Sequence, residues 1–277
     1  MKNIVILGCE SIHARIFLEH IKFGSAFSSL NVIGVFSEND AAAEELSLKF
    51  GIKKMQSFDE AAGEADGVII TARDGALHYK YAKPYIKKGV SMLIDKPITQ
   101  SEEDAKTFAS ALSLAGVKAL GGSSLKYHDT VLRLKQERKA RDGQILGGTV
   151  CAPIITSSEY GGFFFYAQHL VDTVIEIFGH PSDVTATKEN DKIKVNFIYE
   201  SFSVCGVYTE DHHFYSAEVR TADGTFGEEI VIDSLKPLLY RQLSDFTEVI
   251  NGRSEGYSLS ELFFPVSVMN SIFRALR

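Results

Sequence analysis

The sequence is poor in cysteine and in cationic charge, and it has no long apolar run. Its three cysteines, Cys9, Cys151 and Cys205, are odd in number and far apart. This spacing favours reduced thiols in a cytoplasm and disfavours a disulfide framework or a cysteine-based zinc site. Lys and Arg number 29 against 36 Asp and Glu, which gives a formal net charge of −7. An acidic chain disfavours nucleic acid and anionic membranes as partners.

No apolar run reaches the roughly 18 residues that a membrane-spanning helix needs. The chain starts directly with a strand-like segment after Met1, without an apolar leader. We therefore expect a cytoplasmic protein with no membrane partner. Its 277 residues, 45% of them hydrophobic and 23% charged, suffice for one large domain or two medium ones.

The first 120 residues alternate short apolar runs with helical patterns. The expected strands cover residues 3–8, 31–36, 67–71, 90–95 and 117–121, and the expected helices cover 11–24, 40–51, 76–89 and 101–116. Several of these helices end in glycine, which is a common helix stop. The alternation predicts an α/β domain with a Rossmann-type, doubly wound parallel sheet over residues 1–121.

After residue 121 the sequence becomes rich in strand-like segments. Expected strands cover 148–156, 183–188, 192–199, 203–209, 214–221 and 227–233, and helices cover 129–141 and 162–178. This order predicts an α+β second domain over 122–277, built on an open, mostly antiparallel sheet. The last helices, 237–251 and 260–275, could pack on either domain. An open sheet leaves a face to be covered, so we expect a homodimer or higher homo-oligomer formed through it.

The apolar run from Val90 to Ile94 ends abruptly in Asp95-Lys96-Pro97. Proline lacks an N–H and has a fixed φ, so it ends the ladder and biases Lys96 towards an extended conformation. Lys96 is therefore expected at the carboxyl end of a strand, where open α/β sheets bind their ligands. On these residues alone, a surface charge and a group aimed into a cleft are equally good interpretations.

The first turn from strand to helix runs from Gly8 to His13. A dinucleotide fingerprint, Gly-x-Gly-x-x-Gly, has glycines that permit a tight turn and a close approach of the pyrophosphate. Here only Gly8 is glycine, and Glu10 and His13 hold the other two positions. A carboxylate beside a pyrophosphate is unfavourable unless it points away. The helix N-terminus at Ser11 and Ile12 still favours an anion, so the position in the fold supports nucleotide binding.

The tip of the second strand carries Ser37 and Glu38. Proteins that bind NAD place an acid there for the ribose hydroxyls. Ser37 holds the expected place and Glu38 follows it, with no adjacent arginine to pair with a 2′-phosphate. The pair favours NAD over NADP. The alternative is that these residues only turn the chain and cap the next helix.

The helix expected over 162–178 places Phe165, His169 and Asp172 on one face. A histidine with an acid three residues later could be a general base with an orienting partner. A satisfied core histidine is the alternative. Glu10, His13 and His78 could converge as a polar pocket at the strand ends, but we expect no metal there.

These segments, taken in order, resemble the Gfo/Idh/MocA family of oxidoreductases. Asp95-Lys96-Pro97 resembles its Glu-Lys-Pro motif, and the stretch from Asp66 to His78 resembles its strand and loop leading to a helix with histidine at the start. Gly161-Gly162 followed by His169 and Asp172 resembles its substrate-domain helix. Residues 239–252 resemble its closing helix, so the likeness runs along essentially the whole chain.

The resemblance implies roles for individual residues. Lys96 would position the substrate hydroxyl and steady charge on its oxygen, while His169 exchanges the hydroxyl proton. Phe165 holds the place where the family often has an aspartate, and Asp172 would partly replace that group by orienting His169. Lys126-Tyr127 matches a region that often supplies a basic substrate contact. These six residues make up the expected substrate site.

The implied activity is an NAD- or NADP-dependent hydride transfer at a hydroxyl or carbonyl carbon of a sugar, a cyclitol or a similar small polar metabolite. The expected cofactor contacts are Gly8, Glu10, Ser11, Ile12, His13, Ser37, Glu38, Thr71, Ala72, His78, Asp95, Lys96 and Pro97. The alternative is a diverged, non-catalytic relative that binds a nucleotide or metabolite as a sensor or partner subunit. It is motivated by Glu10, His13 and Phe165.

Overall fold

The computed structural model describes residues 1–189, 192–210 and 214–277. It divides into two compact units, which are described separately. The first unit comprises Met1–Gly122 and Lys236–Phe264, and the second comprises Ser123–Leu235 and Pro265–Arg277. In the part of the chain that is described, no helix has the length and apolarity needed to cross a membrane.

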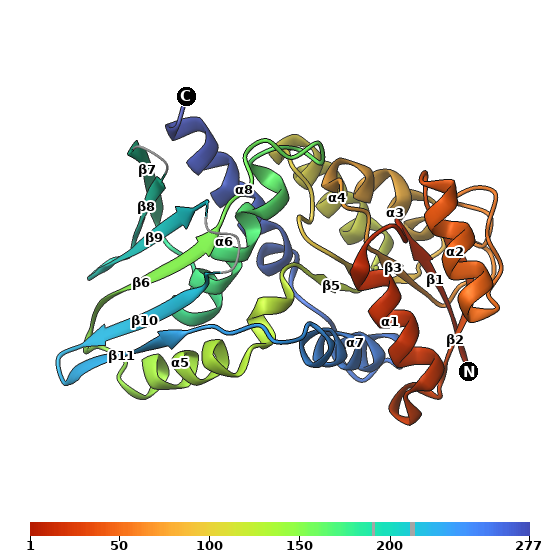
Figure 1. The fold of residues 1–277 in the computed structure, drawn as a ribbon, viewed down its shortest axis with the longest axis horizontal. Coiled ribbons are helices and arrows are strands. Elements are labelled where there is room, and N and C mark those ends of the chain that lie inside the picture. Colours follow the sequence, from red (N-terminus) through yellow and green to blue (C-terminus); the bar gives the residue numbers. More distant parts are fainter. Residues whose placement is uncertain (190–191, 211–213) are drawn as a thin grey trace. The chain divides into compact units, whose positions relative to one another are not determined.

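The first unit is built on a five-stranded parallel sheet of order β2-β1-β3-β4-β5 (Figure 1). Its strands are β1 (Lys2–Leu7), β2 (Leu30–Phe36), β3 (Gly67–Ile70), β4 (Ser91–Ile94) and β5 (Ala119–Gly121). Every residue of β3 is buried, as are the last four of β1 and the last three of β4, because layers of helix cover both faces. The expected doubly wound parallel sheet is confirmed.

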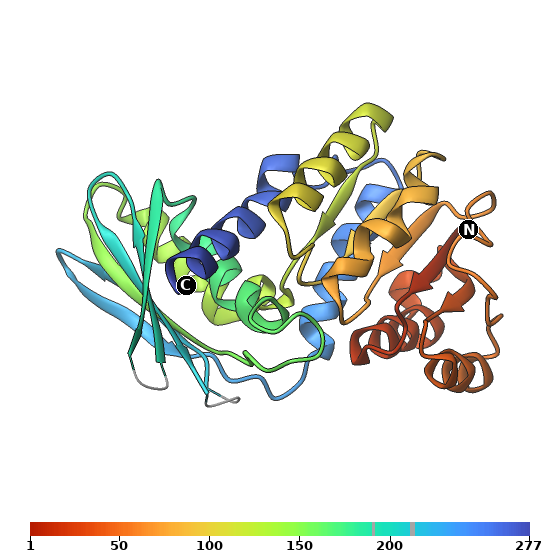
Figure 2. The same ribbon diagram turned by 90° about the horizontal axis from the view of Figure 1, so that it is seen from above.

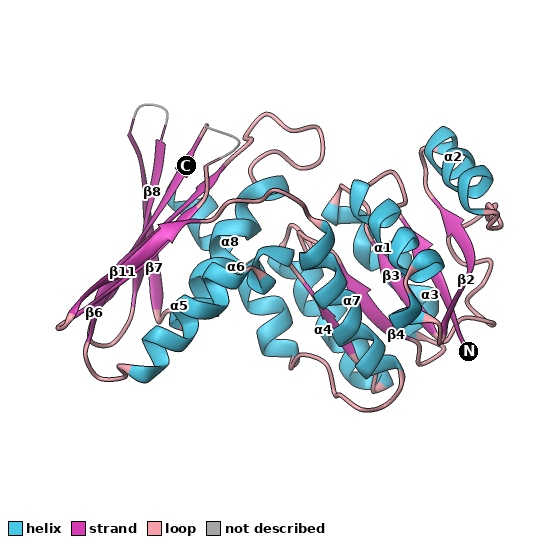
Figure 3. Ribbon diagram, turned by 60° about the horizontal axis from the view of Figure 1, so that its bottom comes forward, coloured by secondary structure: helices cyan, strands magenta, loops and turns pink. Residues whose placement is uncertain are grey.

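The helices of this unit begin and end at the residues that their caps dictate. They are α1 (Ile12–Phe23), α2 (Asp40–Phe50), α3 (His78–Ile86), α4 (Glu102–Ala115) and α7 (Lys236–Ile250), with short 3₁₀ turns η1 (Ser25–Phe27) and η2 (Gly75–Leu77). The side chains of Ser11, Asn39 and Ser101 accept a bond from a backbone N–H of the first turn of α1, α2 and α4. Helix α7 packs against α1, β4 and β5 (Figure 3).

The second unit is built on a six-stranded sheet of order β11-β10-β6-β9-β8-β7. Its strands are β6 (Ile145–Pro153), β7 (Asp183–Glu189), β8 (Lys192–Ile198), β9 (Ser203–Thr209), β10 (Ser216–Thr221) and β11 (Gly224–Glu229). Only the β6–β9 pair is parallel, so the expected mostly antiparallel sheet is confirmed. Helices α5 (Asp129–Ala140) and α6 (Phe164–Phe178) lie on one side of it (Figure 2).

Side chains alternate across this second sheet, as a half-covered sheet requires. The face against the helices buries Val195, Phe197, Val204, Tyr208 and Val219. On the opposite side, β8 and β9 expose the alternate residues. Among the described residues of this unit, that outer face carries no helix (Figure 2).

Several boundaries differ from the expectation, and strand β6 covers Ile145–Pro153 instead of residues 148–156. The last strand, β11, begins at Gly224 instead of residue 227, because a two-residue turn pairs Gly224 directly with Thr221 of β10. The helix expected over 76–89 is divided into η2 and α3, with His78 as the first residue of α3. The final helix, α8 (Leu259–Ala275), belongs to the first unit up to Phe264 and to the second from Pro265.

Candidate functional site

The carboxyl ends of the parallel strands in the first unit bring most of the expected cofactor residues to one edge of the sheet. The register pairs Leu7 with both Phe36 and Ile70, and Ile70 with Ile94. The residues that follow these ends are therefore neighbours. They are Gly8, Ser37, Thr71 and Asp95. Such an edge is the usual ligand position in an open α/β sheet.

Gly8 is the one fingerprint glycine that the chain retains, and the geometry requires it. Its φ is +74°, and a Cβ built there would lie 2.2 Å from the backbone nitrogen of Ala72. The Thr71 hydroxyl donates to the Gly8 carbonyl at 3.0 Å. His78 Nε2 lies 2.8 Å from the Ala72 carbonyl, and burial lowers the pKa of His78. The turn and the loop after β3 therefore form one tightly packed structure.

A buried hydrogen-bonded pair, His13 and Asp95, joins the start of α1 to the end of β4. Nδ1 of His13 lies 2.7 Å from Oδ2 of Asp95, and both residues are buried. The Lys96 backbone N–H donates to the other oxygen of Asp95 at 2.8 Å. Burial by itself would raise the pKa of Asp95, but His13 and Lys96 outweigh it and lower this pKa. His13 thus takes the third glycine position and pairs with the acid of the lysine motif.

Lys96 lies at this edge with only 8% of its surface exposed. The peptide bond between Lys96 and Pro97 is cis, and Pro97 packs against Gly75 of η2, where a Cβ would lie 2.6 Å from Pro97 Cγ. Burial lowers the pKa of Lys96, with Asp95 acting in the opposite direction. Of the two interpretations left open by its sequence, a solvated surface charge is therefore the poorer one.

Glu10 holds the second glycine position and bridges two strand ends. Its Oε2 accepts a bond from the Ser37 hydroxyl at 2.6 Å, and its Oε1 accepts one from the Arg73 backbone N–H at 3.0 Å. Glu38, the other acid expected here, is exposed and pairs with Lys80 at 2.8 Å. The carboxylate bonded to the tip of β2 is thus that of Glu10.

Ser11 and Ile12 form the entrance to α1. The Ser11 hydroxyl accepts a bond from the His13 backbone N–H at 3.2 Å, and Ile12, the first helical residue, is exposed. Ser11 therefore caps the first turn of α1, and the N-terminus of this helix follows the end of β1, where the helix dipole favours an anion.

In the second unit, His169 lies on α6 and is bonded through its Nδ1 to the Ser123 hydroxyl at 2.7 Å. The two residues and Asp172 are all buried. Oδ2 of Asp172 accepts from the Ser123 backbone N–H at 2.6 Å and from Gln168 Nε2 at 3.1 Å. The sequence placed His169 and Asp172 on one helix face and missed Ser123, which joins them.

The expected orienting role of Asp172 towards His169 stays a prediction, and the structure describes a link between the two residues through Ser123. In the described residues the carboxylate reaches Ser123 and Gln168, and it is the Ser123 hydroxyl that holds the imidazole. A side chain three residues away on a helix shares a face, yet here the segment leaving β5 inserts between the two groups. The Gly121-Gly122-Ser123 run after the fifth strand was the available signal.

The remaining expected substrate residues lie on η3 and α6. Lys126 and Tyr127 are half-buried in the short turn η3 (Ser124–Tyr127). Phe165 is buried, with its ring centroid 5.4 Å from that of Tyr160 and 5.1 Å from that of Tyr166. These contacts give Phe165 a packing role, and its contact with substrate stays a prediction.

Asp172 should make the stability of the protein fall as the pH rises. Burial raises the pKa of Asp172, although Lys126 acts against this. Between the ordinary pKa and this raised one, the unfolded chain loses the proton first, so each pH unit costs about 1.4 kcal/mol. We expect Asp172→Asn, which still offers Ser123 an acceptor, to flatten this slope in urea unfolding measured from pH 4 to pH 8.

The matched control is Asp233→Asn, which neutralises an exposed acid in the same unit. Its stability should follow the wild-type pH dependence. If Asp172→Asn instead lost the same stability at every pH, the pKa of Asp172 would be the same in the folded and the unfolded chain. If its loss grew as the pH rose, the carboxylate would be needed in its charged form, and either result would contradict the raised pKa.

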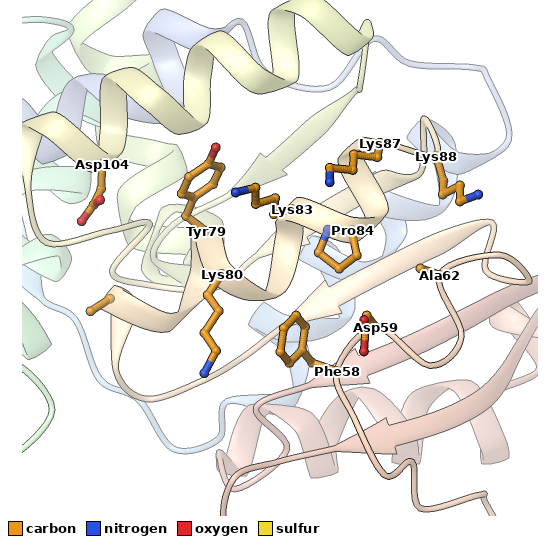
Figure 4. Close-up of a pocket in the computed structure, with 11 residues that line it drawn as sticks. Phe58, Asp59, Ala62, Tyr79, Lys80, Lys83, Pro84, Lys87, Lys88 and Asp104 are labelled. Carbon is orange, nitrogen blue, oxygen red and sulfur yellow. The ribbon is translucent and has the colours of Figure 1, made fainter.

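A surface hollow of about 660 Å³ lies elsewhere in the first unit, over the outer side of α3 (Figure 4). Its wall includes the side chains of four lysines, two on α3 and two directly after it, together with Phe58, Tyr79 and Pro84. The lysines are Lys80, Lys83, Lys87 and Lys88. None of the strand-end residues described above lines it. The hollow is therefore separate from the candidate site.

Comparison with known proteins finds relatives among oxidoreductases. Residues 2–122 match the family model described as "Oxidoreductase family, NAD-binding Rossmann fold". A glucose-6-phosphate 3-dehydrogenase of Bacillus subtilis is 29% identical over 135 residues, which are 49% of this chain and 37% of that protein. An uncharacterized oxidoreductase of Escherichia coli is 22% identical over 61% of this chain and 52% of its own length. The chain thus matches between about a third and a half of these relatives.

Solved structures extend the likeness of fold to the whole chain. A scyllo-inositol dehydrogenase from Lactobacillus casei with bound NAD(H) and scyllo-inositol has a TM-score of 0.83 at 15% identity, covering 100% of this chain and 97% of the other. A myo-inositol dehydrogenase from Corynebacterium glutamicum has a TM-score of 0.84 at 14% identity, covering 100% and 96%. Residues 2–122 thus match the Gfo/Idh/MocA oxidoreductase family, and the chain as a whole shares the fold of these solved structures.

Proposed function

We propose that the protein is a nicotinamide-dependent oxidoreductase acting on a hydroxyl-bearing or carbonyl carbon of a sugar, a cyclitol or a similar small polar metabolite. The observation that carries the proposal is Lys96, a buried lysine at the end of β4 beside the His13–Asp95 pair, in a unit that matches an NAD-binding family. A lysine that served solubility alone would be hydrated, because burying an ammonium is unfavourable.

The residues at the strand edge fit a dinucleotide. Gly8 keeps the close turn, and α1 begins shortly after it, so that its N-terminus favours an anion such as a nucleotide phosphate. The two side chains that replace fingerprint glycines are held in place by hydrogen bonds. Glu10 is bonded to Ser37 and to the Arg73 backbone, and His13 is bonded to Asp95. When bound, the nicotinamide supplies an acceptor or donor of hydride.

In the direction of alcohol oxidation, a bound nicotinamide would accept the hydride from the carbinol carbon, and the hydroxyl proton would pass to the protein. Lys96 donates a hydrogen bond to the substrate oxygen and stabilises the negative charge that develops there. His169 accepts the hydroxyl proton, and Ser123 fixes the plane of its ring. The product is the carbonyl compound, and the reverse reaction follows the same path.

Two observations support a polyhydroxylated substrate and NAD. The inositol dehydrogenases named above share the fold over essentially the whole chain. The strand-edge carboxylate of Glu10 is suited to ribose hydroxyls and unsuited to a 2′-phosphate, and Glu38 is paired with Lys80.

The test is a screen of inositols, sugars and sugar phosphates for absorbance change at the nicotinamide band, with NAD and NADP supplied separately. We expect turnover with at least one cyclic polyol or sugar. Calorimetric titration with NADH accompanies the screen, because it does not depend on finding the substrate. Failure of both NADH and NADPH to bind would contradict the proposal.

We also propose a homodimer or higher homo-oligomer formed through the outer face of the six-stranded sheet. That face exposes Cys205 and half-exposes Val207 in the described part of the unit. The protein is further proposed to work in the cytoplasm, in keeping with its three unpaired cysteines. Light scattering at micromolar concentration measures the assembly, and a monomer there would refute it.

A further inference from the structure

We propose that Glu10 is the carboxylate that binds the hydroxyls of the adenosine ribose and makes the protein select NAD over NADP. The inference rests on the proposed function, and it assigns the selecting group to a different loop from the usual one. In dinucleotide-binding domains the acid follows the second strand. Here that place is held by Ser37, whose hydroxyl carries no charge.

The contacts of Glu10 bring its carboxylate to the place of the missing acid. Glu10 follows β1, yet its Oε2 accepts from the Ser37 hydroxyl at 2.6 Å. Ser37 is itself buried, and its oxygen accepts a bond from the Asn39 backbone N–H at 3.0 Å. The hydroxyl is thereby fixed and directs its proton to Glu10. The Glu10 side chain starts from the β1–α1 turn, and its carboxylate lies at the tip of β2.

The second oxygen of Glu10 is fixed as well, by the Arg73 backbone N–H at 3.0 Å. A carboxylate offers about four acceptor positions, so two bonds leave each oxygen able to accept another. Glu10 is only half-buried, so those positions are open to a ligand. The 2′ and 3′ hydroxyls of a ribose are donors that suit them, whereas a 2′-phosphate brings acceptor oxygens and a like charge.

Glu38 is the rival for this role, since it directly follows Ser37. It is exposed, and its Oε1 accepts from Lys80 Nζ at 2.8 Å, so its charge is turned towards α3. A second rival is that Glu10 obstructs the nucleotide instead of binding it. The two fixed hydrogen bonds argue against obstruction, because they hold the side chain along the strand tips.

The test is calorimetric titration of the full chain with NADH and NADPH, which measures binding without turnover. We expect the wild type to bind NADH more tightly. Glu10→Gln keeps the size of the side chain and removes its charge. It should weaken NADH binding about ten- to hundredfold, since charge-assisted hydrogen bonds are lost, and bring the two affinities close together. Glu44→Gln removes the same charge from α2 and should leave both affinities unchanged.

Each other outcome is distinct. Equal affinity of the wild type for the two cofactors overturns this inference and leaves the oxidoreductase standing. So does tighter NADH binding by Glu10→Gly, which would identify Glu10 as an obstruction, or a loss of preference in Glu38→Gln but not in Glu10→Gln. If neither cofactor binds the wild type, the proposed function fails, and this inference fails with it. Thermal unfolding of each variant shows whether it is folded.

Discussion

Lys96→Met should reduce kcat/KM by about 10²- to 10⁴-fold while NADH binding is retained, because the variant loses the donor that stabilises charge on the substrate oxygen. Methionine is similar in length and can occupy the same buried space. Burial already lowers the pKa of Lys96, which means that the folded protein disfavours its ammonium form. Removing that group should therefore leave the protein at least as stable, and a loss of activity could not be ascribed to unfolding. Steady-state rates and calorimetry on the same preparation check both expectations.

Lys83→Met is the matched control. It makes the same chemical change on an exposed lysine of α3 that lines the surface hollow. Its rate should equal that of the wild type. Unchanged turnover in Lys96→Met would remove the lysine from the mechanism. Loss of both NADH binding and activity would indicate that Lys96 contacts the cofactor and not the substrate.

The parallel sheet could be predicted because strands covered on both faces are continuous apolar runs. Gly67–Ile70 and Ser91–Ile94 are of this kind, and each is followed by a polar residue at the ligand edge. The start of the last strand of the second sheet was predicted less accurately. Strand β11 is exposed along most of its length, so its sequence has no apolar alternation to mark where it begins.

The contacts of the candidate site could be predicted only in part. The residue types at the strand ends follow from position, but the partners of Glu10 do not. The Arg73 backbone N–H that bonds it is 63 residues away and leaves no mark in the identity of residue 73. The same holds for Ser123, which lies 46 residues before His169. Sequence periodicity finds neighbours on one helix, and these pairs are brought together by the chain leaving a sheet.

The hydrogen bond between Ser123 and His169 allows a sharp test of His169 as the proton acceptor. His169→Asn should lower kcat by about 10²- to 10⁴-fold, because the amide cannot take up the substrate proton. Ser123→Ala keeps the imidazole but removes the bond to its Nδ1, so the loss should be nearer tenfold, the worth of about one hydrogen bond. Ser123→Thr restores a hydroxyl and should recover most of the rate. Steady-state rates across the pH range check all three variants.

A purely structural Ser123 would behave differently. Its loss would then lower stability and leave the pH dependence of kcat unchanged. If Ser123 positions His169, its loss should shift the part of the pH profile of kcat that depends on the protonation of His169. Ser124→Ala, which removes the neighbouring buried hydroxyl, supplies the comparison and should leave that part of the profile unmoved. If Ser123→Ala and Ser124→Ala were equally active, the imidazole would be held by its packing against Tyr166 and Tyr215 instead. Ser123 would then have no part in proton transfer.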